Sequence, residues 1–409
     1  MVLGWIGVAF AGALPFFLSG LMTPVEAYFE AMAGFMTTGA STVVRPEGVA
    51  PSLLLWRSLC QWAGGIGIVV LFVAIGPLVG FGAAQLLSAE IANPVPERLT
   101  PRIRDTAKTL AIIYLVLSLG GIVVLYLVGM NLFEAVNHSL TTVATGGYST
   151  RSGSIEAFDS WAIELAITVG MLLSGTNFAL YYMASQGRLA RVFRDPELRA
   201  YLGIAAVGTL IVTISLWVLE FQDSLLFAFR EALFQTVSLL TGTAFSSSDW
   251  NTWDPLSQSL LILFMAIGGC AGSTSGGLKI IRTVLLSQHG WQQIFHMIHP
   301  RAITPLKIQD RTLPERLRTS VLGFFFIYVL TLMAGTLIIA AHQVPIENAL
   351  GSVFACMNIT GTFLGSVGSA EFYETLPATA KLALTFFMLL GRLELLTVLV
   401  ILTPAFWRG

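Results

Sequence analysis

The stretch TTVATGGYST, residues 141–150, lies between two long apolar runs and follows the segment FEAVNHSL, in which Glu134 precedes Ala135. The same order of an acid, a short apolar run and a small polar turn occurs in three further segments: VEAYFEAMAGFMTTGAST, REALFQTVSLLTGTAFSS and IENALGSVFACMNITGTF. Internal repetition constrains a fold more strongly than any single motif. The sequence therefore predicts four copies of one structural unit.

The spacing within the copies is nearly constant. A step of 13 residues leads from Glu26 to Gly39, from Glu134 to Gly147 and from Glu231 to Ala244, whereas from Glu347 it leads to Thr360, with Gly361 one residue later. The four acids recur at intervals of 108, 97 and 116 residues. Four unrelated capped loops are the alternative interpretation, but ordinary surface loops need no matched spacing.

The composition is that of a membrane protein. Of the 409 residues, 55% are hydrophobic and 11% are charged, and the mean hydropathy is +0.78, whereas soluble domains carry about 25% charged residues. A spanning helix needs about 20 apolar residues. Candidate spans lie at about 2–22, 52–80, 106–129, 160–185, 199–220, 256–285, 316–342 and 377–405. A net charge of −1 argues against a nucleic-acid partner.

Basic residues are concentrated on three alternate connections, 81–105, 186–198 and 286–315, and at their flanking helix ends. Lys and Arg favour the cytoplasmic side of a membrane, so we expect these connections to be cytosolic. The remaining chain divides into four repeats, 1–80, 106–185, 199–285 and 316–409. Each is expected to contain a helix, a re-entrant segment of 10–14 residues that is too short to span, a small polar turn and a second helix.

Irregular backbone at membrane depth is tolerated where protein buries it or where it lines a watery cavity. Four such turns in one chain can close around a pseudo-four-fold axis, where glycine lets successive carbonyls approach one line. A ring of carbonyl oxygens replaces the hydration shell of a monovalent cation, and nearby threonine hydroxyls add oxygen ligands. The sequence thus predicts an all-α membrane protein with a cation selectivity filter.

The four turns, together with GGCAGSTSGGLKIIR (268–282) and MLLGRLELLTVLVILTPAFW (388–407), resemble the Trk/Ktr/HKT superfamily of potassium transporters, most closely its bacterial Trk-type membrane subunit. The resemblance covers the whole chain. It implies a K⁺-channel-like fold with four M1–P–M2 repeats around one pore, K⁺ as the transported ion, no organic cofactor, a homodimer in the bacterial inner membrane, and a cytosolic nucleotide-binding regulatory ring of the RCK type as partner.

The family's filter positions fall on Thr38, Gly39, Thr145, Gly146, Gly147, Thr243, Ala244, Thr360 and Gly361, and Thr37 beside them adds a hydroxyl to the expected filter. Of these we expect Thr38, Gly39, Thr145, Gly146, Thr243, Thr360 and Gly361 to bind K⁺. Two departures stand out. Ala244 replaces the usual glycine and pays a steric cost for positive φ, so we expect a different backbone or weaker selectivity there. Gly361 comes one residue late, which leaves its register open. Gly39 occupies a position where serine accompanies sodium permeation in the family, and glycine favours potassium.

The segment GGCAGSTSGGLK interrupts a predicted span, and its glycines disfavour a continuous helix. It does not match a phosphate-binding loop, because Leu278 separates Gly277 from Lys279. Close helix packing through small residues is one interpretation. The other, which the resemblance also implies, is a flexible gate loop beneath the filter, with these small residues as its functional positions: Gly268, Gly269, Gly272, Ser273, Gly276 and Gly277.

Arg392 lies about halfway along the last predicted span, where a charge costs at least about 2.5–3.5 kcal/mol. It either pairs locally with Glu394 or faces the pore, where it would slow cations, and family members have a matching arginine. We expect it to be the pore barrier.

Three functions compete at this point. A K⁺-selective uptake pore is favoured, with a coupled K⁺ symporter (with H⁺ or Na⁺) and a less selective K⁺/Na⁺ pathway as alternatives; parallel repeats suit a pore better than the inverted repeats of many transporters. An enzyme is not expected, because no nucleophile–base pair or metal set has the required spacing.

Overall fold

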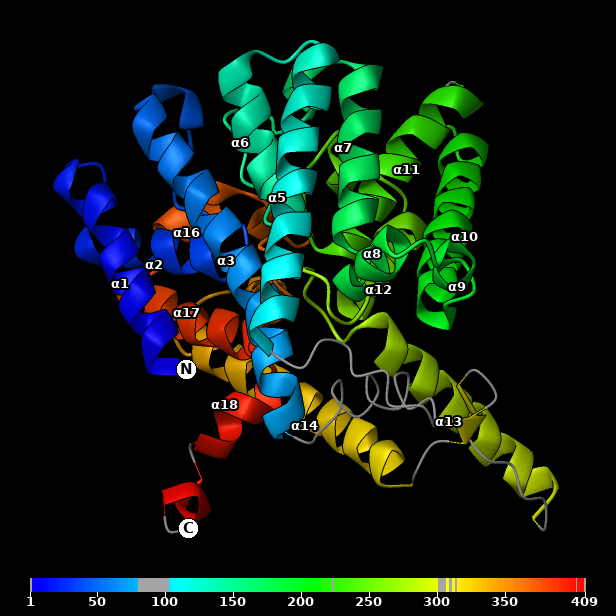
Figure 1. Ribbon diagram of the computed structural model, residues 1–409. Coiled ribbons are helices and arrows are strands. Elements are labelled where there is room, and N and C mark those ends of the chain that lie inside the picture. The colour runs from blue at the N-terminus through cyan, green and yellow to red at the C-terminus, as the bar shows by residue number, and fades with distance from the viewer. Residues whose placement is uncertain are drawn as a thin grey trace.

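The computed structural model describes residues 2–79, 103–222, 224–300, 307–308, 311–312, 315–401 and 403–407. This part of the chain is nearly all helix (Figure 1), which confirms the predicted fold class. One exception is a minute antiparallel hairpin of β1 (Lys307–Ile308) and β2 (Arg311–Thr312), in which Lys307 lies opposite Thr312. Most of the first basic connection, 81–105, lies outside the described residues.

Four units follow one another along the chain, each with a first helix, a short helix and a second helix. The first helices are α1 (Val2–Leu18), α5 (Ile103–Leu127), α10 (Pro196–Val218) and α14 (Glu315–Ala340). The short helices are α2 (Pro24–Phe35), α6 (Leu132–Val143), α11 (Leu225–Thr241) and α15 (Ile346–Met357). The second helices are α3 (Pro51–Val79), α7 (Trp161–Ser174) with α8 (Phe178–Ser185), α12 (Pro255–Ile267) with α13 (Ile280–Ile298), and α17 (Ala378–Arg392) with α18 (Leu395–Ile401).

Smaller helical elements occupy the connections. They are α9 (Leu189–Val192), α16 (Ala370–Thr375) and the 3₁₀ turns η1 (Pro46–Gly48), η2 (Glu156–Phe158), η3 (Trp250–Thr252), η4 (Gly365–Gly368) and η5 (Pro404–Trp407). Most of the 3₁₀ turns follow a short helix and precede a second helix, so they line the outer mouth described below.

The short helices start where the sequence provides a cap. Thr23 caps α2 in a reciprocal arrangement with Glu26, and Pro24 occupies the first turn, where its missing N–H costs nothing. Asn131 caps α6 by accepting a hydrogen bond from the Glu134 N–H. Glu26, Glu134 and Glu347 are first-turn residues of their short helices, where the helix dipole stabilises an acid, whereas Glu231 lies further along α11, which begins at Leu225.

The units pack as a ring, because the second helix of one unit lies against the short helix of another. α3 packs on α6, α7 on α11 and α17 on α2. In the described residues α12 makes no comparable contact with α15; instead the loop after α12 reaches Asn358 at the end of α15, and a Cβ on Gly276 would collide with the Asn358 carbonyl. The polypeptide thus closes the ring with a loop where the other units use a helix.

Three second helices are interrupted. The glycine-rich segment predicts the break within 256–285, whereas the predicted spans 160–185 and 377–405 carried no expected break. α7 and α8 meet at a bend of 90°, and α17 and α18 at a bend of 116°. α12 ends at Ile267, and α13 begins only at Ile280 and runs into the predicted connection 286–315. α13 projects from the bundle as a separate helix (Figure 1). Glycine-rich or small polar segments at the first two breaks explain why the helices end there.

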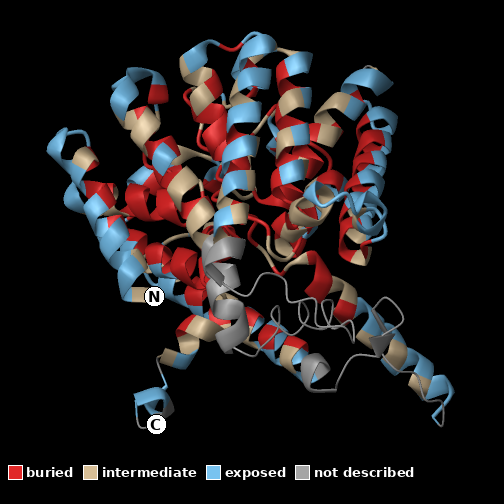
Figure 2. Cartoon of the chain, in the orientation of Figure 1, coloured by how far each residue is buried: buried red, intermediate tan, exposed pale blue. Residues whose placement is uncertain are grey.

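By length and composition, three described helices can cross a membrane, namely Ala107–Leu127, Pro196–Val218 and Thr319–Ala340, or up to five if each bent pair counts as one span. Large apolar side chains are exposed on their outer faces, including Val116, Leu210 and Phe326. Buried residues gather in the middle of the bundle and exposed ones around it (Figure 2). An apolar exterior of this kind suits contact with lipid.

Candidate functional site

Each short helix ends in a triplet with one backbone conformation. The triplets are Thr37–Gly39, Thr145–Gly147, Gly242–Ala244 and Ile359–Gly361. The first residue has φ of +55°, +52°, +72° and +58° in chain order, and the third has +81°, +73°, +59° and +62°. Such values are uncommon outside glycine, so their recurrence in four places identifies a repeated, specialised backbone.

The triplets form a closed ring. A Cβ on Gly39 would collide with the carbonyl oxygen of Gly146, one on Gly147 with that of Thr243, and one on Gly361 with that of Thr38. At the remaining junction a Cβ on Gly242 would lie 3.4 Å from the carbonyl oxygen of Ile359. Carbonyl oxygens of all four units therefore converge, and a side chain has no room at three of the four junctions.

The threonine hydroxyls of the triplets differ in their partners. The Oγ1 atoms of Thr37 and Thr38 are buried without a hydrogen-bond partner. Those of Thr145, Thr243 and Thr360 contact the Ala144 carbonyl at 2.7 Å, the Thr241 hydroxyl at 2.8 Å and the Ala355 carbonyl at 3.4 Å. Among the described residues, the first unit thus offers two hydroxyl oxygens that no protein group satisfies.

Protein donors hold two of the candidate carbonyls. Gln61 Nε2 donates to the Gly146 oxygen at 2.6 Å, and the Tyr373 hydroxyl donates to the Gly361 oxygen at 3.0 Å. A carbonyl has two lone pairs, so these oxygens keep one for a second partner. Gln61 and Tyr373 lie on elements other than the triplets, and no pattern in the sequence indicates that either residue contacts the filter.

The helix cap resolves the register of the fourth triplet. From the cap to the last triplet residue is 16 residues in the first unit (Thr23 to Gly39) and also in the fourth (Pro345 to Gly361). Gly361 is therefore in register, and Glu347 is one residue early, because it follows its cap by two positions instead of three. The structure thereby fixes the register that the sequence leaves open.

Ala244 adopts the conformation of the glycines. Its φ of +59° shows that this quarter keeps the common backbone, contrary to the expectation of a different one. Gly242 supplies the first position of the same triplet, and Ile359 that of the fourth. Neither was among the predicted filter residues.

Above the ring lies an outer cavity of about 1460 Å³, including its open mouth, lined by residues of all four triplets. Contacts between units encircle it. The Ser152 N–H donates to Glu47 at 2.7 Å, the Ile155 N–H to the Ser246 carbonyl at 2.9 Å, the Gly365 N–H to Asn251 at 2.8 Å, and Lys381 pairs with Glu26 at 2.9 Å. Hydrogen bonds from Ser152 lower the pKa of the Glu47 carboxyl, which keeps it ionised as an acceptor.

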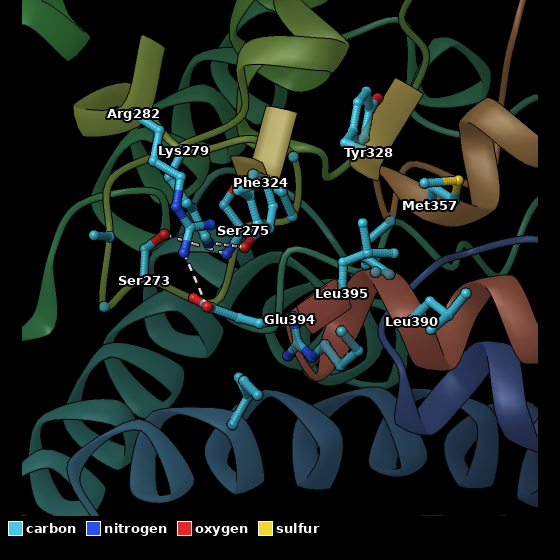
Figure 3. Close-up of a pocket in the computed structure, with 18 of the residues that line it drawn as sticks. Ser273, Ser275, Lys279, Arg282, Phe324, Tyr328, Met357, Leu390, Glu394 and Leu395 are labelled. Atoms are coloured by element: carbon cyan, nitrogen blue, oxygen red, sulfur yellow. Dashed lines mark hydrogen bonds and ion pairs between the residues drawn. The ribbon is translucent and has the colours of Figure 1, made fainter. Parts of the chain in front are cut away.

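Below the ring lies an inner cavity of about 930 Å³, including the open space at its mouth. Ser273, Ser275 and Lys279 of the loop line one side of it, and Met357 and Leu390 come from the fourth unit (Figure 3). Arg282 at the start of α13 pairs with Glu394 at 2.9 Å, across the cavity wall (Figure 3). The cavity thus separates the filter ring from the α13 side of the molecule.

The loop between α12 and α13 is bonded to several units at once. Thr274 Oγ1 donates to the carbonyls of Val143 (3.1 Å) and Ser174 (3.3 Å), and Ser275 Oγ donates to the Thr241 carbonyl at 2.6 Å. Val143 and Thr241 are the last residues of α6 and α11, immediately before their triplets. The loop therefore lies directly beneath the second and third triplets.

The predicted gate glycines make this packing possible. A Cβ on Gly269 would lie 2.9 Å from the Gly175 oxygen, and one on Gly272 2.9 Å from Asn177 Oδ1. A Cβ on Gly268 would meet Gly276, and one on Gly277 would lie 2.8 Å from Gly268. Ser273 bonds within the loop, to the Cys270 carbonyl at 2.6 Å. Both earlier interpretations, close packing and a loop beneath the filter, describe one arrangement.

Arg392 is buried, with 4% of its surface exposed, and lines the inner cavity. Nη1 donates to the Thr274 carbonyl at 2.5 Å and Nη2 contacts the Gly64 carbonyl at 3.3 Å, whereas Nε has no partner. Glu394 pairs with Arg282 instead, so the local Arg392–Glu394 pair is excluded. The guanidinium therefore joins the loop to the fourth unit, and no carboxylate of the described residues pairs with it.

A ring of four re-entrant helices, each ending in a carbonyl-bearing triplet inside an apolar bundle, defines a cation-transporting membrane protein. The chain belongs to the TrkH family, described as "Cation transport protein", which matches residues 2–408. This family is one of transporters, not of enzymes.

Named relatives extend the match. The Trk system potassium uptake proteins TrkH of Salmonella typhimurium and Escherichia coli K12 are each 40% identical over 100% of this chain and 85% of their own. The TrkH of Halomonas elongata is 40% identical over 99% of this chain and 84% of its own. The crystal structure of the potassium transporter TrkH from Vibrio parahaemolyticus superposes with a TM-score of 0.91 at 37% identity, covering 99% of this chain and 84% of that one.

Proposed function

We propose that this protein takes up K⁺ across the bacterial inner membrane through a selective pore whose axis passes through the ring of triplets. The ring itself carries the proposal, because four equivalent units bring backbone carbonyls to one point between two cavities. Such carbonyls replace the hydration shell of a monovalent cation. Relatives that are 40% identical over the whole chain are named potassium uptake proteins.

In this proposal K⁺ is held by oxygens of the four triplets, with Thr38, Gly39, Thr145, Gly146, Thr243, Thr360 and Gly361 as ligands. The C-terminal ends of the short helices precede the triplets and add negative potential that favours a cation. The loop 268–277 closes the pathway beneath the filter, and the guanidinium of Arg392 repels K⁺ in a low-dielectric cavity.

The relatives are named as parts of a Trk system. We extend this to a homodimeric pore subunit whose basic connections face the cytosol and bind a nucleotide-binding regulatory ring of the RCK type. The nucleotide belongs to that partner. The Arg282–Glu394 pair at the start of α13, next to the loop, supports this proposal, because a partner that moves α13 would also move the loop.

The test is cation flux in proteoliposomes, with Rb⁺ or K⁺ compared with Na⁺. Downhill flux should favour K⁺, and Arg392→Ala should raise it at least about tenfold, since removing the buried charge lowers the barrier by at least about 1.4 kcal/mol. Arg392→Lys keeps the charge and is the matched control, expected near the wild-type rate. Flux that requires a second ion gradient would instead indicate a coupled symporter, and equal Na⁺ flux a less selective pathway.

A further inference from the structure

One position is polar and buried in all four short helices, and the repeat of acids and glycines in the sequence does not reveal it. Nine residues before the last residue of each triplet stands a buried polar side chain: Glu30, His138, Gln235 and Ser352. Three of them bind the segment that leaves the triplet. Glu30 accepts from the Thr42 N–H at 2.9 Å, His138 Nε2 contacts Ser149 Oγ at 3.0 Å, and Gln235 accepts from the Ser247 N–H at 3.4 Å. The fourth, Ser352, bonds within its own helix.

Only the first unit places an acid at this position. Glu30 pairs with Arg57 at 2.7 Å, and the two side chains are 0% and 4% exposed. The Ser41 hydroxyl donates to Glu30 at 3.0 Å and accepts from Arg57 Nη2 at 2.9 Å. Removing two charges from water costs several kcal/mol per ion, and hydrophobic residues of similar volume often stabilise a fold more. A buried pair retained inside a membrane protein is therefore more often functional than stabilising.

The same face of α3 also holds the second triplet. Gln61 lies one helical turn after Arg57. Its amide donates to the Gly146 carbonyl at 2.6 Å and accepts from the Tyr148 N–H at 3.3 Å, so it binds the residues on either side of Gly147, the last residue of the triplet. The Arg57 guanidinium lies 4.1 Å from the Tyr148 ring centre. The Tyr148 hydroxyl in turn contacts the carbonyls of Glu30 and Ala40 at 3.2 Å. One helix thus fixes two adjacent quarters of the ring against each other.

We infer that Glu30, Arg57 and Gln61 are positioning residues that set the discrimination of K⁺ from Na⁺ by fixing the first and second quarters of the filter. This rests on the proposed function. Na⁺ is smaller than K⁺, so it is coordinated fully only if the oxygens move inward, and selectivity depends on the size and field of the oxygen cage. The triplet segments that the Glu30–Arg57 pair and the Gln61 amide hold in place resist this inward movement of their oxygens.

The experiment measures the ratio of Rb⁺ to Na⁺ flux in proteoliposomes for wild type, Glu30→Gln, Gln61→Met and the double variant Glu30→Gln/Arg57→Gln. The matched control is Glu164→Gln. Glu164 is also a buried acid, paired with Arg230 at 2.6 Å, but it bonds no segment that leaves a triplet. Thermal unfolding of each purified variant separates loss of stability from loss of selectivity.

Glu30→Gln and Gln61→Met are each expected to lower the flux ratio at least about fivefold, and Glu164→Gln to leave it within about twofold. The double variant leaves no buried charge unpaired, so it should recover thermal stability while its flux ratio stays low. Recovery of the ratio together with stability would show that the pair only supports folding. If Glu30→Gln does not fold, the flux ratio of Gln61→Met tests the inference, because this variant removes the contacts to the second triplet without changing a charge.

An unchanged ratio in Gln61→Met and in every folded Glu30 variant would overturn the inference while K⁺ uptake by the wild type stands. Absence of K⁺-selective flux in the wild type itself would overturn the proposed function, and this inference with it, before any variant is considered.

Discussion

Ala244 shows how a single residue is forced by the ring that surrounds it. Its φ of +59° matches the glycines at the same place in the other units. For an L-residue this conformation costs about 1–2 kcal/mol. The cost persists because the neighbouring triplets fix the backbone, since strained backbone survives only where its surroundings determine it.

Replacing Ala244 by glycine should therefore stabilise the protein by about 1 kcal/mol, because glycine adopts positive φ without the steric penalty. The measurement is the free energy of unfolding of the purified protein by denaturant titration. Gly242→Ala is the counterpart in the same triplet. With φ of +72° and its nearest neighbour at 3.4 Å from the new Cβ, it should lose a similar amount through backbone strain alone. Destabilisation by Ala244→Gly would mean that the alanine methyl group contributes packing that outweighs the strain.

The sequence indicated positive φ at the third residue of the triplets and not at the first. A glycine that recurs at the same step, or one residue from it, reveals where positive φ is needed, so Gly39, Gly147 and Gly361 could be nominated. Ile359 and Thr37 have positive φ as well, but a residue with a side chain gives no sign of this in the sequence. The positioning residues Glu30, Arg57 and Gln61 could not be recognised from the sequence for another reason. Their partners lie on other elements, and only the folded ring brings them together.

At the scale of elements, the short helices were predictable and the breaks were less so. Caps such as Thr23 and Asn131 and the limited apolar length mark α2 and α6. The glycine-rich stretch at 268–277 also predicted an interruption. By contrast, the bend after α17 falls on Leu393 and Glu394, which are neither glycine nor proline, and Glu394 takes φ of +60°. That break depends on contacts of Arg392 and Glu394 with the loop and with Arg282, which no local pattern records.

The loop should open more readily if its hydrogen bonds to the second unit are removed. Thr274→Val keeps the shape of the side chain and removes donation to the Val143 and Ser174 carbonyls. A typical hydrogen bond contributes about 0.5–1.5 kcal/mol. The Thr274 hydroxyl has one proton, so its two contacts share a single donated hydrogen bond. If this bond exists only while the loop lies across the pathway, K⁺ flux should rise by up to about tenfold, measured in proteoliposomes without the regulatory partner.

Ser273→Ala is the control for that experiment, because the Ser273 hydroxyl donates only to Cys270 within the loop. Its flux should remain near the wild-type value. Slower flux in Thr274→Val would contradict a closing role for the loop and would favour one in which its contacts hold the pathway open.

At the scale of the molecule, the outer contacts and the inner loop act at opposite ends of the ring. Contacts such as Ser152 with Glu47 and Lys381 with Glu26 join different units around the outer cavity. On the inner side, the loop and Arg392 join the units through hydrogen bonds to backbone carbonyls. The proposed function accordingly assigns selectivity to the ring between these two sets of contacts and gating to the inner loop.

That assignment depends on orientation, which the distribution of basic residues predicts and which labelling can test. The three native cysteines, Cys60, Cys270 and Cys356, are free and buried, so a membrane-impermeant maleimide should react with introduced cysteines over a low background. Glu371 lines the outer cavity, and Gln186 is exposed in the second basic connection. In intact cells Glu371→Cys should be labelled, whereas Gln186→Cys should react only after the membrane is permeabilised, because Lys- and Arg-rich connections remain in the cytoplasm. The opposite result would place α13 and the loop outside the cell, where no cytosolic regulator could reach them.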